Sequence, residues 1–219
     1  FIQSNLFWES TDLNLEHFDS LIDKINVESQ IIILPEMFNT AFSINPEKCA
    51  ETIDGKTINW MKHQASKKNA VIAGSLLINQ NSRYYNRFIW MQPDGNYQYY
   101  DKRHLFRMSD EFKIFNQGSK RTIVEIDGWK ANLNICYDLR FPVWTKNTFN
   151  EGKYEYDIII NVANWPASRS YVWQTLLKAR AIENQCYVIG VNRIGDDGFG
   201  TPHSGDSMAL DPYGNEIIR

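Results

Sequence analysis

The chain has 219 residues, 43% of them hydrophobic and 14% aromatic, and a formal net charge of −3 at pH 7. This size and apolar content fit one globular domain spanning residues 1–219 and exclude a disordered chain. The slightly negative balance leaves no broad basic surface, so nucleic acid is not an expected partner.

Helical periodicity is present in two segments. The first has apolar residues at helical spacing at Leu15, Phe18, Ile22 and Ile25. The second spans residues 171–185, where we expect one apolar face made of Leu176, Leu177, Ala181 and Ile182.

Apolar runs rich in β-branched residues predict buried strands at residues 31–34, 70–78, 88–91, 133–136, 158–162 and 188–191. Two Asp-Gly pairs, in FIWMQPDGNYQYY and TIVEIDGWKANLNI, predict hairpins. Strands that alternate with helices, together with hairpins, predict an α/β fold whose sheet is mixed.

The three cysteines and the chain ends bear on the compartment. Positions 49, 136 and 186 are far apart and odd in number, which favours neither a disulfide framework nor a zinc site. No apolar run approaches the roughly 20 residues of a membrane span, and the first residues lack a signal-peptide pattern. We therefore expect a cytoplasmic protein that does not bind membranes.

Because the sequence stops at Arg219 within an apolar run, we also expect the domain to continue beyond it.

A carboxylate follows the first predicted strand. In IIILPEMF, Glu36 comes directly after an apolar run and Pro35. Open α/β sheets gather ligand-binding groups at the carboxyl ends of their strands. A solvated loop residue or a helix cap is the ordinary alternative for such a glutamate.

A basic cluster follows the first hairpin. The strand NYQYY leads into DKRHLF and delivers Lys102 to a strand end. The ordinary alternative is a surface charge paired with Asp101 or Glu111, because most lysines are of this kind.

Cys136 lies in LNICYDLRFPVW, where an apolar strand ends and a helix is predicted to begin at Phe141 and Pro142. Backbone N–H groups and the positive end of a helix dipole favour a thiolate and can bind an oxyanion. Taken alone, a cysteine at a strand end is more often an inert buried residue.

The chemistry of the three residues fits one reaction. Amide hydrolysis by a thiol needs a nucleophile, a base that takes its proton and later activates water, and a cation for the anionic intermediate. Cys136, Glu36 and Lys102 supply one of each.

The motifs ILPEMF, YDKRHLF and ICYDLRFP, in that order, resemble the three signature regions of the nitrilase (carbon–nitrogen hydrolase) superfamily. The downstream segment VANWPASRSYVWQTLLKARAIENQCYVIGVNRIGDDG resembles that of the omega-amidase branch. The resemblance implies an αββα four-layer sandwich with mixed sheets, a homodimer or higher homo-oligomer, and no metal or organic cofactor.

The same resemblance implies roles for individual residues. Glu36 corresponds to the general base, Lys102 to the cation that stabilises the intermediate, and Cys136 to the nucleophile. Glu111, in SDEFKIFNQG, falls where a second glutamate holds the lysine in place; an ordinary loop carboxylate is the alternative. The omega-amidase branch implies a small amide of a 2-oxo dicarboxylate, 2-oxoglutaramate or 2-oxosuccinamate, as substrate.

Several neighbours of these residues are candidates for substrate binding. The backbone N–H of Tyr137 is expected to help stabilise the oxyanion, and Phe38, Phe42 and Trp165 are expected to line the pocket. Arg140 is a candidate for the distal carboxylate. An ion pair of Arg140 with Asp138 or Glu111 is an equal alternative.

Other functions stay open from the sequence alone. A carbamoylase, an aliphatic amidase or a nitrilase of the same superfamily shares the catalytic residues. A Cys-His hydrolase would use His17, His63, His104 or His203 as its base, although none of these lies in a typical protease context. A non-catalytic binding module is the alternative outside the enzymes.

Overall fold

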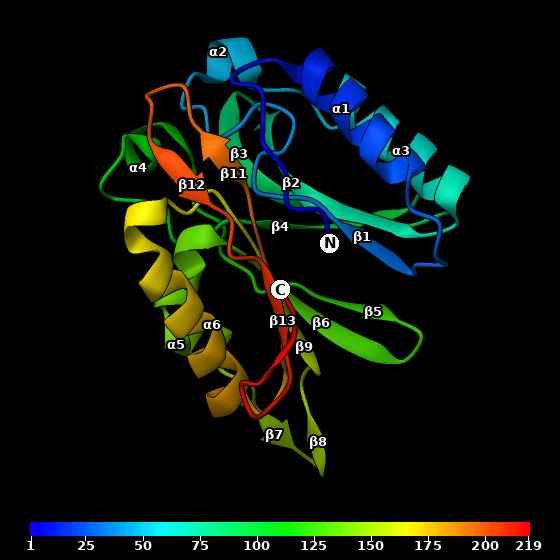
Figure 1. Cartoon of the computed structure of the whole chain (residues 1–219), viewed down its shortest axis with the longest axis vertical. Coiled ribbons are helices and arrows are strands. Elements are labelled where there is room, and N and C mark those ends of the chain that lie inside the picture. Colours follow the sequence, from blue (N-terminus) through cyan, green and yellow to red (C-terminus); the bar gives the residue numbers. More distant parts are fainter.

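Two β-sheets are stacked face to face between two layers of helices (Figure 1). The computed structural model describes all residues, 1–219. The order of layers is helix, sheet, sheet, helix, because α1 and α3 cover the outer face of one sheet and α6 covers the outer face of the other. The αββα sandwich with mixed sheets, predicted from the resemblance, is therefore confirmed.

The first sheet has the strand order β1-β2-β3-β4. Its strands are β1 (Ile31–Ile33), β2 (Val71–Gln80), β3 (Arg83–Met91) and β4 (Tyr97–Asp101). β1 runs parallel to β2, whereas β3 is antiparallel to both of its neighbours. The predicted turn at Asp94 and Gly95 joins β3 to β4, with a φ of 83° at Gly95 that suits glycine.

The second sheet has the order β14-β13-β10-β9-β6-β5. Its strands are β5 (Ile123–Ile126), β6 (Trp129–Ile135), β9 (Ile158–Ala163), β10 (Tyr187–Asn192), β13 (Met208–Leu210) and β14 (Glu216–Ile218). β6, β9 and β10 are mutually parallel, and the outer pairs are antiparallel. The second predicted hairpin, at Asp127 and Gly128, joins β5 to β6. Two short hairpins complete the strands: β7 (Phe149–Asn150) with β8 (Lys153–Tyr154), and β11 (Ile194–Asp196) with β12 (Pro202–Ser204).

Three helices are long enough to form layers: α1 (Thr11–Asp23), α3 (Lys56–Lys68) and α6 (Ser170–Asn184). The remaining helical elements are single turns: α2 (Pro46–Cys49), α4 (Glu111–Ile114), η1 (Cys136–Arg140), α5 (Pro142–Thr145) and η2 (Ala167–Arg169). None of the helices combines the length and apolar character that crossing a membrane requires.

The central core lies between the sheets and explains why the strands are apolar without alternation. Phe88 and Trp90 of the first sheet pack with Leu133 and Ile160 of the second. A separate cluster joins α1 and α3 to the first sheet, and another joins α6 to the second. Strands covered on both faces read as continuous hydrophobic runs, as the sequence shows.

Two details of the predicted helices are wrong. In α6 the buried residues include Trp173, Leu177 and Ala181, which are four residues apart, whereas Leu176 is half-buried and Ile182 is 55% exposed. Residues four apart lie on one side of a helix, so this row faces the sheet and Ile182 faces solvent. The first helix ends at Asp23, and Ile25 packs on the core from the segment after it.

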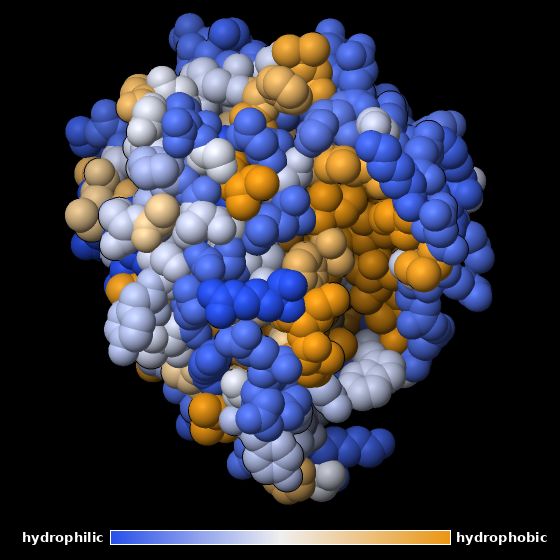
Figure 2. All heavy atoms as spheres, in the orientation of Figure 1, coloured by the Kyte–Doolittle hydropathy of each residue, from blue (hydrophilic) through white to orange (hydrophobic).

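The face seen in Figure 2 has a hollow between the two sheets whose floor is apolar. Its lining includes Ile31, Ile126, Trp129, Ile158 and Tyr187. It shares no residue with the cavity that holds Cys136.

Candidate active site

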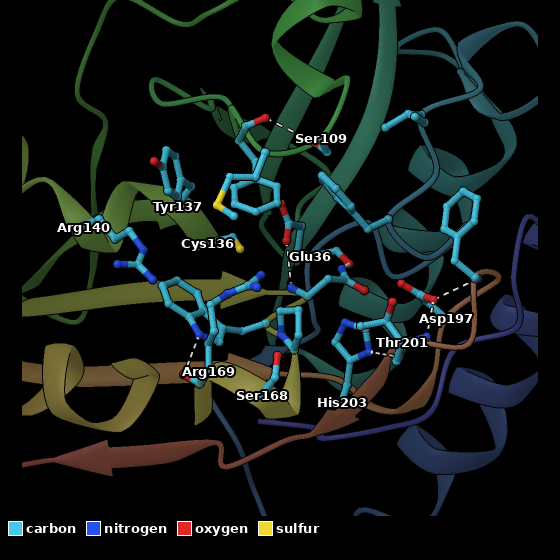
Figure 3. Close-up of a pocket in the computed structure, with 18 of the residues that line it drawn as sticks. Glu36, Ser109, Cys136, Tyr137, Arg140, Ser168, Arg169, Asp197, Thr201 and His203 are labelled. Atoms are coloured by element: carbon cyan, nitrogen blue, oxygen red, sulfur yellow. Dashed lines mark hydrogen bonds between the residues drawn. The ribbon is translucent and has the colours of Figure 1, made fainter. Parts of the chain in front are cut away.

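One end of the sandwich carries a cavity of about 410 Å³ with Glu36, Lys102 and Cys136 in its wall (Figure 3). Glu36 lies three residues after β1, Lys102 follows β4 and Cys136 follows β6. Elements distant in sequence therefore bring the three residues to one site, because their strands end at the same edge of the two sheets. The volume suits a small molecule.

Glu36 is fully buried and all of its hydrogen bonds come from within the protein. Its Oε1 accepts from Lys102 Nζ at 2.8 Å and from Asn86 Nδ2 at 2.8 Å. Its Oε2 accepts from the backbone N–H of Asn164 at 2.7 Å. The alternative of a solvated loop carboxylate is wrong, since three donor atoms of the site fix this carboxylate in one orientation.

Lys102 is also fully buried and lies between two carboxylates. Its Nζ is 2.8 Å from Glu36 Oε1, and 2.9 and 3.0 Å from the two carboxylate oxygens of Glu111. Burial alone would lower the pKa of Lys102, but Glu111 and Glu36 more than offset it, so the pKa lies above its usual value. Lys102 is thus held as a cation. Its ion pair with Glu111 is buried, so the alternative of a surface ion pair is wrong.

Asn86 was not predicted from the sequence. It lies within β3, is fully buried, and its Nδ2 donates to both Glu36 and Glu111. Its backbone oxygen accepts from the N–H of Lys102 at 2.9 Å. Asn86 therefore connects all three charged groups. The available signal was an amide side chain inside a strand whose last four residues, 88–91, are apolar.

Cys136 begins η1 with a φ of 45°, a left-handed conformation that is uncommon for residues other than glycine. The chain turns sharply there from β6 into η1. Such strained positions often coincide with functional sites.

The expectation that helix N–H groups favour a Cys136 thiolate is wrong. The pKa of Cys136 is raised well above its usual value, first because the thiol is buried and second because the Glu36 carboxylate lies near it. Lys102 acts in the opposite direction and does not compensate. The helix that follows at Pro142–Thr145 is a single turn, too short to reverse these effects. The resting group is a thiol beside a carboxylate.

Asp138 ties the turn of Cys136 to the segment that carries Lys102. Its Oδ2 accepts from Tyr100 Oη at 2.8 Å and from the N–H of Ile135 at 3.1 Å. Its Oδ1 accepts from the N–H of His104 at 2.9 Å and lies 2.8 Å from His104 Nδ1. Asp138 is thus fully engaged by groups other than Arg140.

Arg140 forms no ion pair with Asp138 or Glu111, so the alternative of a buttressing pair is wrong. Its guanidinium lies 5.2 Å from the ring centroid of Trp165 and lines the cavity.

Three other predicted pocket residues, Phe42, Tyr137 and Trp165, line the cavity with Arg140. The expectation that Phe38 lines it is wrong. Phe38 is fully buried and packs edge-to-face on Phe18 of α1. Its side chain points away from the cavity into the core between the helices and the first sheet.

Further wall residues come from two segments in which only His203 was named from the sequence. Asp197, Phe199, Thr201 and His203 come from the β11–β12 hairpin. Arg169 comes from η2, which leads into α6. His203 Nδ1 donates to the Thr201 carbonyl oxygen at 2.9 Å, and burial lowers the pKa of His203.

The other two cysteines lie apart from this cavity. Cys49 is buried beside Met37 and Leu77, and Cys186 is buried beneath α6. Burial raises the pKa of both thiols, to about 12 for Cys186. Neither lines the cavity.

Comparison with known proteins identifies the family. The family model for carbon-nitrogen hydrolases matches residues 1–219. The omega-amidase YafV of Escherichia coli is 46% identical over 217 residues, covering 99% of this chain and 82% of the relative. The 2-oxoglutaramate amidase of Bacillus subtilis is 31% identical over 224 residues, covering 100% of this chain and 84% of the relative.

A solved structure agrees with these matches. XC1258 from Xanthomonas campestris, a CN-hydrolase superfamily protein with an arsenic adduct in its active site, superposes with a TM-score of 0.96. It is 41% identical, and the match covers 99% of this chain and 83% of that one. The chain therefore belongs to the carbon–nitrogen hydrolase family, and it is an amidase that hydrolyses carbon–nitrogen bonds other than peptide bonds.

Proposed function

We propose that this member of the carbon–nitrogen hydrolase family is an omega-amidase, hydrolysing the terminal carboxamide of 2-oxoglutaramate or 2-oxosuccinamate. The observation that carries the proposal is the buried contact of Lys102 Nζ with Glu36 Oε1, 2.8 Å, in the wall of the cavity that also holds Cys136. Relatives named omega-amidase and 2-oxoglutaramate amidase align over nearly the whole chain.

In the first half-reaction, Glu36 takes the proton of the Cys136 thiol while the sulfur attacks the amide carbon. The raised pKa of Cys136 means that this proton must be removed during attack, which assigns the general base a necessary part. Lys102 and the backbone N–H of Tyr137 stabilise the oxyanion of the tetrahedral intermediate. The carbon–nitrogen bond breaks, the nitrogen takes the proton from Glu36, and ammonia leaves a thioester on Cys136.

In the second half-reaction, Glu36 takes a proton from water as the water oxygen attacks the thioester carbon. The carbon–sulfur bond breaks, the sulfur regains a proton, and a carboxylic acid is released. Every catalytic group used here is a side chain or backbone amide of the chain itself.

Glu111 acts through Lys102. Both of its oxygens lie within 3.0 Å of Lys102 Nζ, and it is not part of the cavity wall. It holds the ammonium beside Glu36 and offsets the cost of burying a cation. Burial raises the pKa of Glu111, and Lys102 counteracts that rise.

The walls of the cavity select the substrate. Phe42 and Trp165 limit its length, and the exposed Arg140 adds positive charge at the rim of the cavity. Phe42 also lies with its ring centroid 5.2 Å from Lys102 Nζ, so it keeps water from one side of the ammonium.

We also infer that residues 1–219 make one catalytic domain, that the enzyme assembles as a homodimer or higher homo-oligomer, and that it works in the cytoplasm. The free state of all three cysteines supports a reducing compartment. Light scattering of the purified protein tests the assembly, and a molar mass of a single chain contradicts it.

A substrate panel tests the proposed activity. Ammonia release is measured with 2-oxoglutaramate, glutamine, an N-carbamoyl amino acid and a simple nitrile. We expect the highest kcat/KM with 2-oxoglutaramate. A preference for the N-carbamoyl amino acid or the nitrile assigns the enzyme to another branch of the same family.

A further inference from the structure

Two arginine side chains, Arg140 and Arg169, line the cavity without a partner. Neither guanidinium forms an ion pair or a hydrogen bond within the protein, although other half-buried or buried arginines do. Figure 3 shows both on the same side of the cavity, across from Asp197. A guanidinium has five N–H donors, so an unpartnered one in a cavity wall is available for an anion.

The two arginines differ in their exposure. Arg169 is half-buried, with its guanidinium 5.6 Å from the ring centroid of Phe106, whereas Arg140 is exposed on η1. An ion pair is stronger where water is partly excluded. The half-buried guanidinium therefore contributes more to binding an anion than the exposed one.

The position of Arg169 is fixed by the segment that also holds the general base. Trp165 Nε1 donates to the Arg169 carbonyl at 2.9 Å, and the Arg169 N–H donates to Pro166 at 3.0 Å. Upstream in the same segment, Asn164 binds the carboxylate of Glu36 through its N–H. The distance between the base and Arg169 is thus set by six residues in a turn with internal hydrogen bonds.

The charge on the opposite side of the cavity favours the same orientation of a bound substrate. Asp197 is a carboxylate whose Oδ1 accepts from the N–H groups of Phe199 and Thr201. A negative group on a substrate is repelled from that side and attracted to the side of the arginines.

We propose that Arg169 is the principal residue that binds the distal carboxylate of the substrate and that Arg140, at the rim, has a secondary part. This inference rests on the proposed function and deepens it: the substrates are amides that carry a carboxylate at the end opposite the scissile bond. Arg169 is a specificity residue, which acts on binding and leaves the chemical steps at Cys136 intact.

The test compares a charged and a neutral amide of equal chain length, 2-oxoglutaramate and pentanamide. The variants are Arg169→Ala, Arg169→Lys and Arg140→Ala, with Arg83→Ala as a control for loss of an exposed arginine that does not line the cavity. We expect Arg169→Ala to raise KM for 2-oxoglutaramate about ten- to hundredfold, with little change for pentanamide. Arg140→Ala should raise it less, and Arg169→Lys should retain part of the affinity because lysine lacks the two-pronged geometry.

Equal losses for both amides in Arg169→Ala would overturn the inference, as would a larger effect of Arg140→Ala. Calorimetric binding of 2-oxoglutarate separates this inference from the proposed function. If the wild type binds 2-oxoglutarate through Arg169 but releases no ammonia from 2-oxoglutaramate, the carboxylate site stands and the proposed activity fails. If ammonia is released but Arg169→Ala binds 2-oxoglutarate like the wild type, the activity stands and the site is elsewhere.

Discussion

The two sides of the cavity are built differently. The inner side consists of Glu36, Lys102 and, behind it, Glu111; each is fully buried, and their charges are paired. The outer side includes Met108 and Phe199, which are 78% and 75% exposed. Glu36 and Lys102 follow strands and are fixed by buried hydrogen bonds, whereas the outer groups come from turns and hairpins.

This contrast indicates different roles for the two sides of the cavity. A base and a cation act in catalysis only when held in fixed geometry and low dielectric, and the inner side supplies both conditions. Loops on a rigid scaffold change more readily, so specificity belongs on the outer side. Substitutions on the inner side should therefore lower kcat, and those on the outer side should raise KM.

The largest effect is expected for Cys136→Ala. It should abolish turnover and leave the fold intact, because Cys136 is the only thiol in the cavity wall and alanine cannot form the acyl intermediate. Mass spectrometry of the wild type with substrate should show an adduct on the peptide with Cys136. Cys49 and Cys186 are internal controls, and an adduct on either would contradict the assignment of the nucleophile.

Next in size are Glu36→Gln and Lys102→Ala. Loss of a positioned base costs about 10² to 10⁴ in rate and loss of an oxyanion donor about 10² to 10³. The effects should not multiply in the double variant, because the residues act as a unit with Cys136. Near wild-type kcat in either single variant contradicts the mechanism.

Lys102→Ala should also destabilise the fold, by about 3 to 5 kcal/mol, because it leaves two buried carboxylates without their cation. Glu36→Gln keeps the shape of the side chain and removes one negative charge beside Lys102. Denaturant unfolding of both variants separates loss of chemistry from loss of folding, and equal stabilities would argue against a paired buried cluster.

The sequence named the three residues that the structure brings together on the inner side and four of the cavity-lining residues, but it missed Asn86 and Arg169. Glu36 and Cys136 each follow an apolar strand, Lys102 follows the hairpin strand β4, and strand ends converge in a sandwich of this kind. Asn86 was missed because a single amide within a strand gives no hint that it faces two carboxylates. Arg169 was missed because its place in the cavity wall depends on a turn that the local sequence does not specify.

The wrong predictions have the same physical origin. Phe38 lies two residues after Glu36 and was placed in the pocket by proximity, but the chain turns there and sends its ring into the core. The favoured thiolate was inferred from a helix that is one turn long, while burial of the thiol and, second, the Glu36 charge raise the pKa of Cys136. Both errors concern where a side chain points after a turn and which groups then surround it. Strand and helix patterns in the sequence do not specify this.

The variants Phe38→Ala and Phe42→Ala compare the loss of a core residue with the loss of a cavity-lining residue. Phe38→Ala should cost about 3 to 5 kcal/mol of folding stability, because it empties a buried site, with KM nearly unchanged. Phe42→Ala should cost less stability and raise KM, because its ring lines the cavity. Thermal unfolding and steady-state kinetics on both variants provide the measurement; a KM effect confined to Phe38→Ala would reverse the two assignments.

The pH behaviour of Cys136 is a smaller but sharper test of the inner side. Since its pKa is raised, the thiolate should not appear as the pH rises through the usual value of 9.0. Glu36→Gln removes a negative charge that disfavours the thiolate, so the pKa should fall. Lys102→Ala removes a favourable positive charge, so the pKa should rise further.

The measurement is the ultraviolet absorbance of the thiolate in each protein, minus that of the same protein carrying Cys136→Ser. The subtraction removes the contributions of Cys49, Cys186 and the tyrosines. A thiolate already present at neutral pH in the wild type would contradict the raised pKa and support the thiolate that the sequence predicts.

The smallest effect is expected for His104→Ala, which tests the Cys-His alternative. His104 contacts Asp138 through Nδ1 and stacks on Phe141 with ring centroids 3.7 Å apart, but it is not in the cavity wall. Asp138 keeps its bonds from Tyr100 and from the backbone, so the turn of Cys136 should survive. We expect kcat to fall less than about tenfold and stability to fall by about 1 kcal/mol, as for one lost hydrogen bond. Alkylation of Cys136 by iodoacetamide should proceed as in the wild type, because Glu36 and not a histidine takes the proton. Loss of both turnover and alkylation, in a variant that still unfolds cooperatively, would make His104 the base and remove Glu36 from that role.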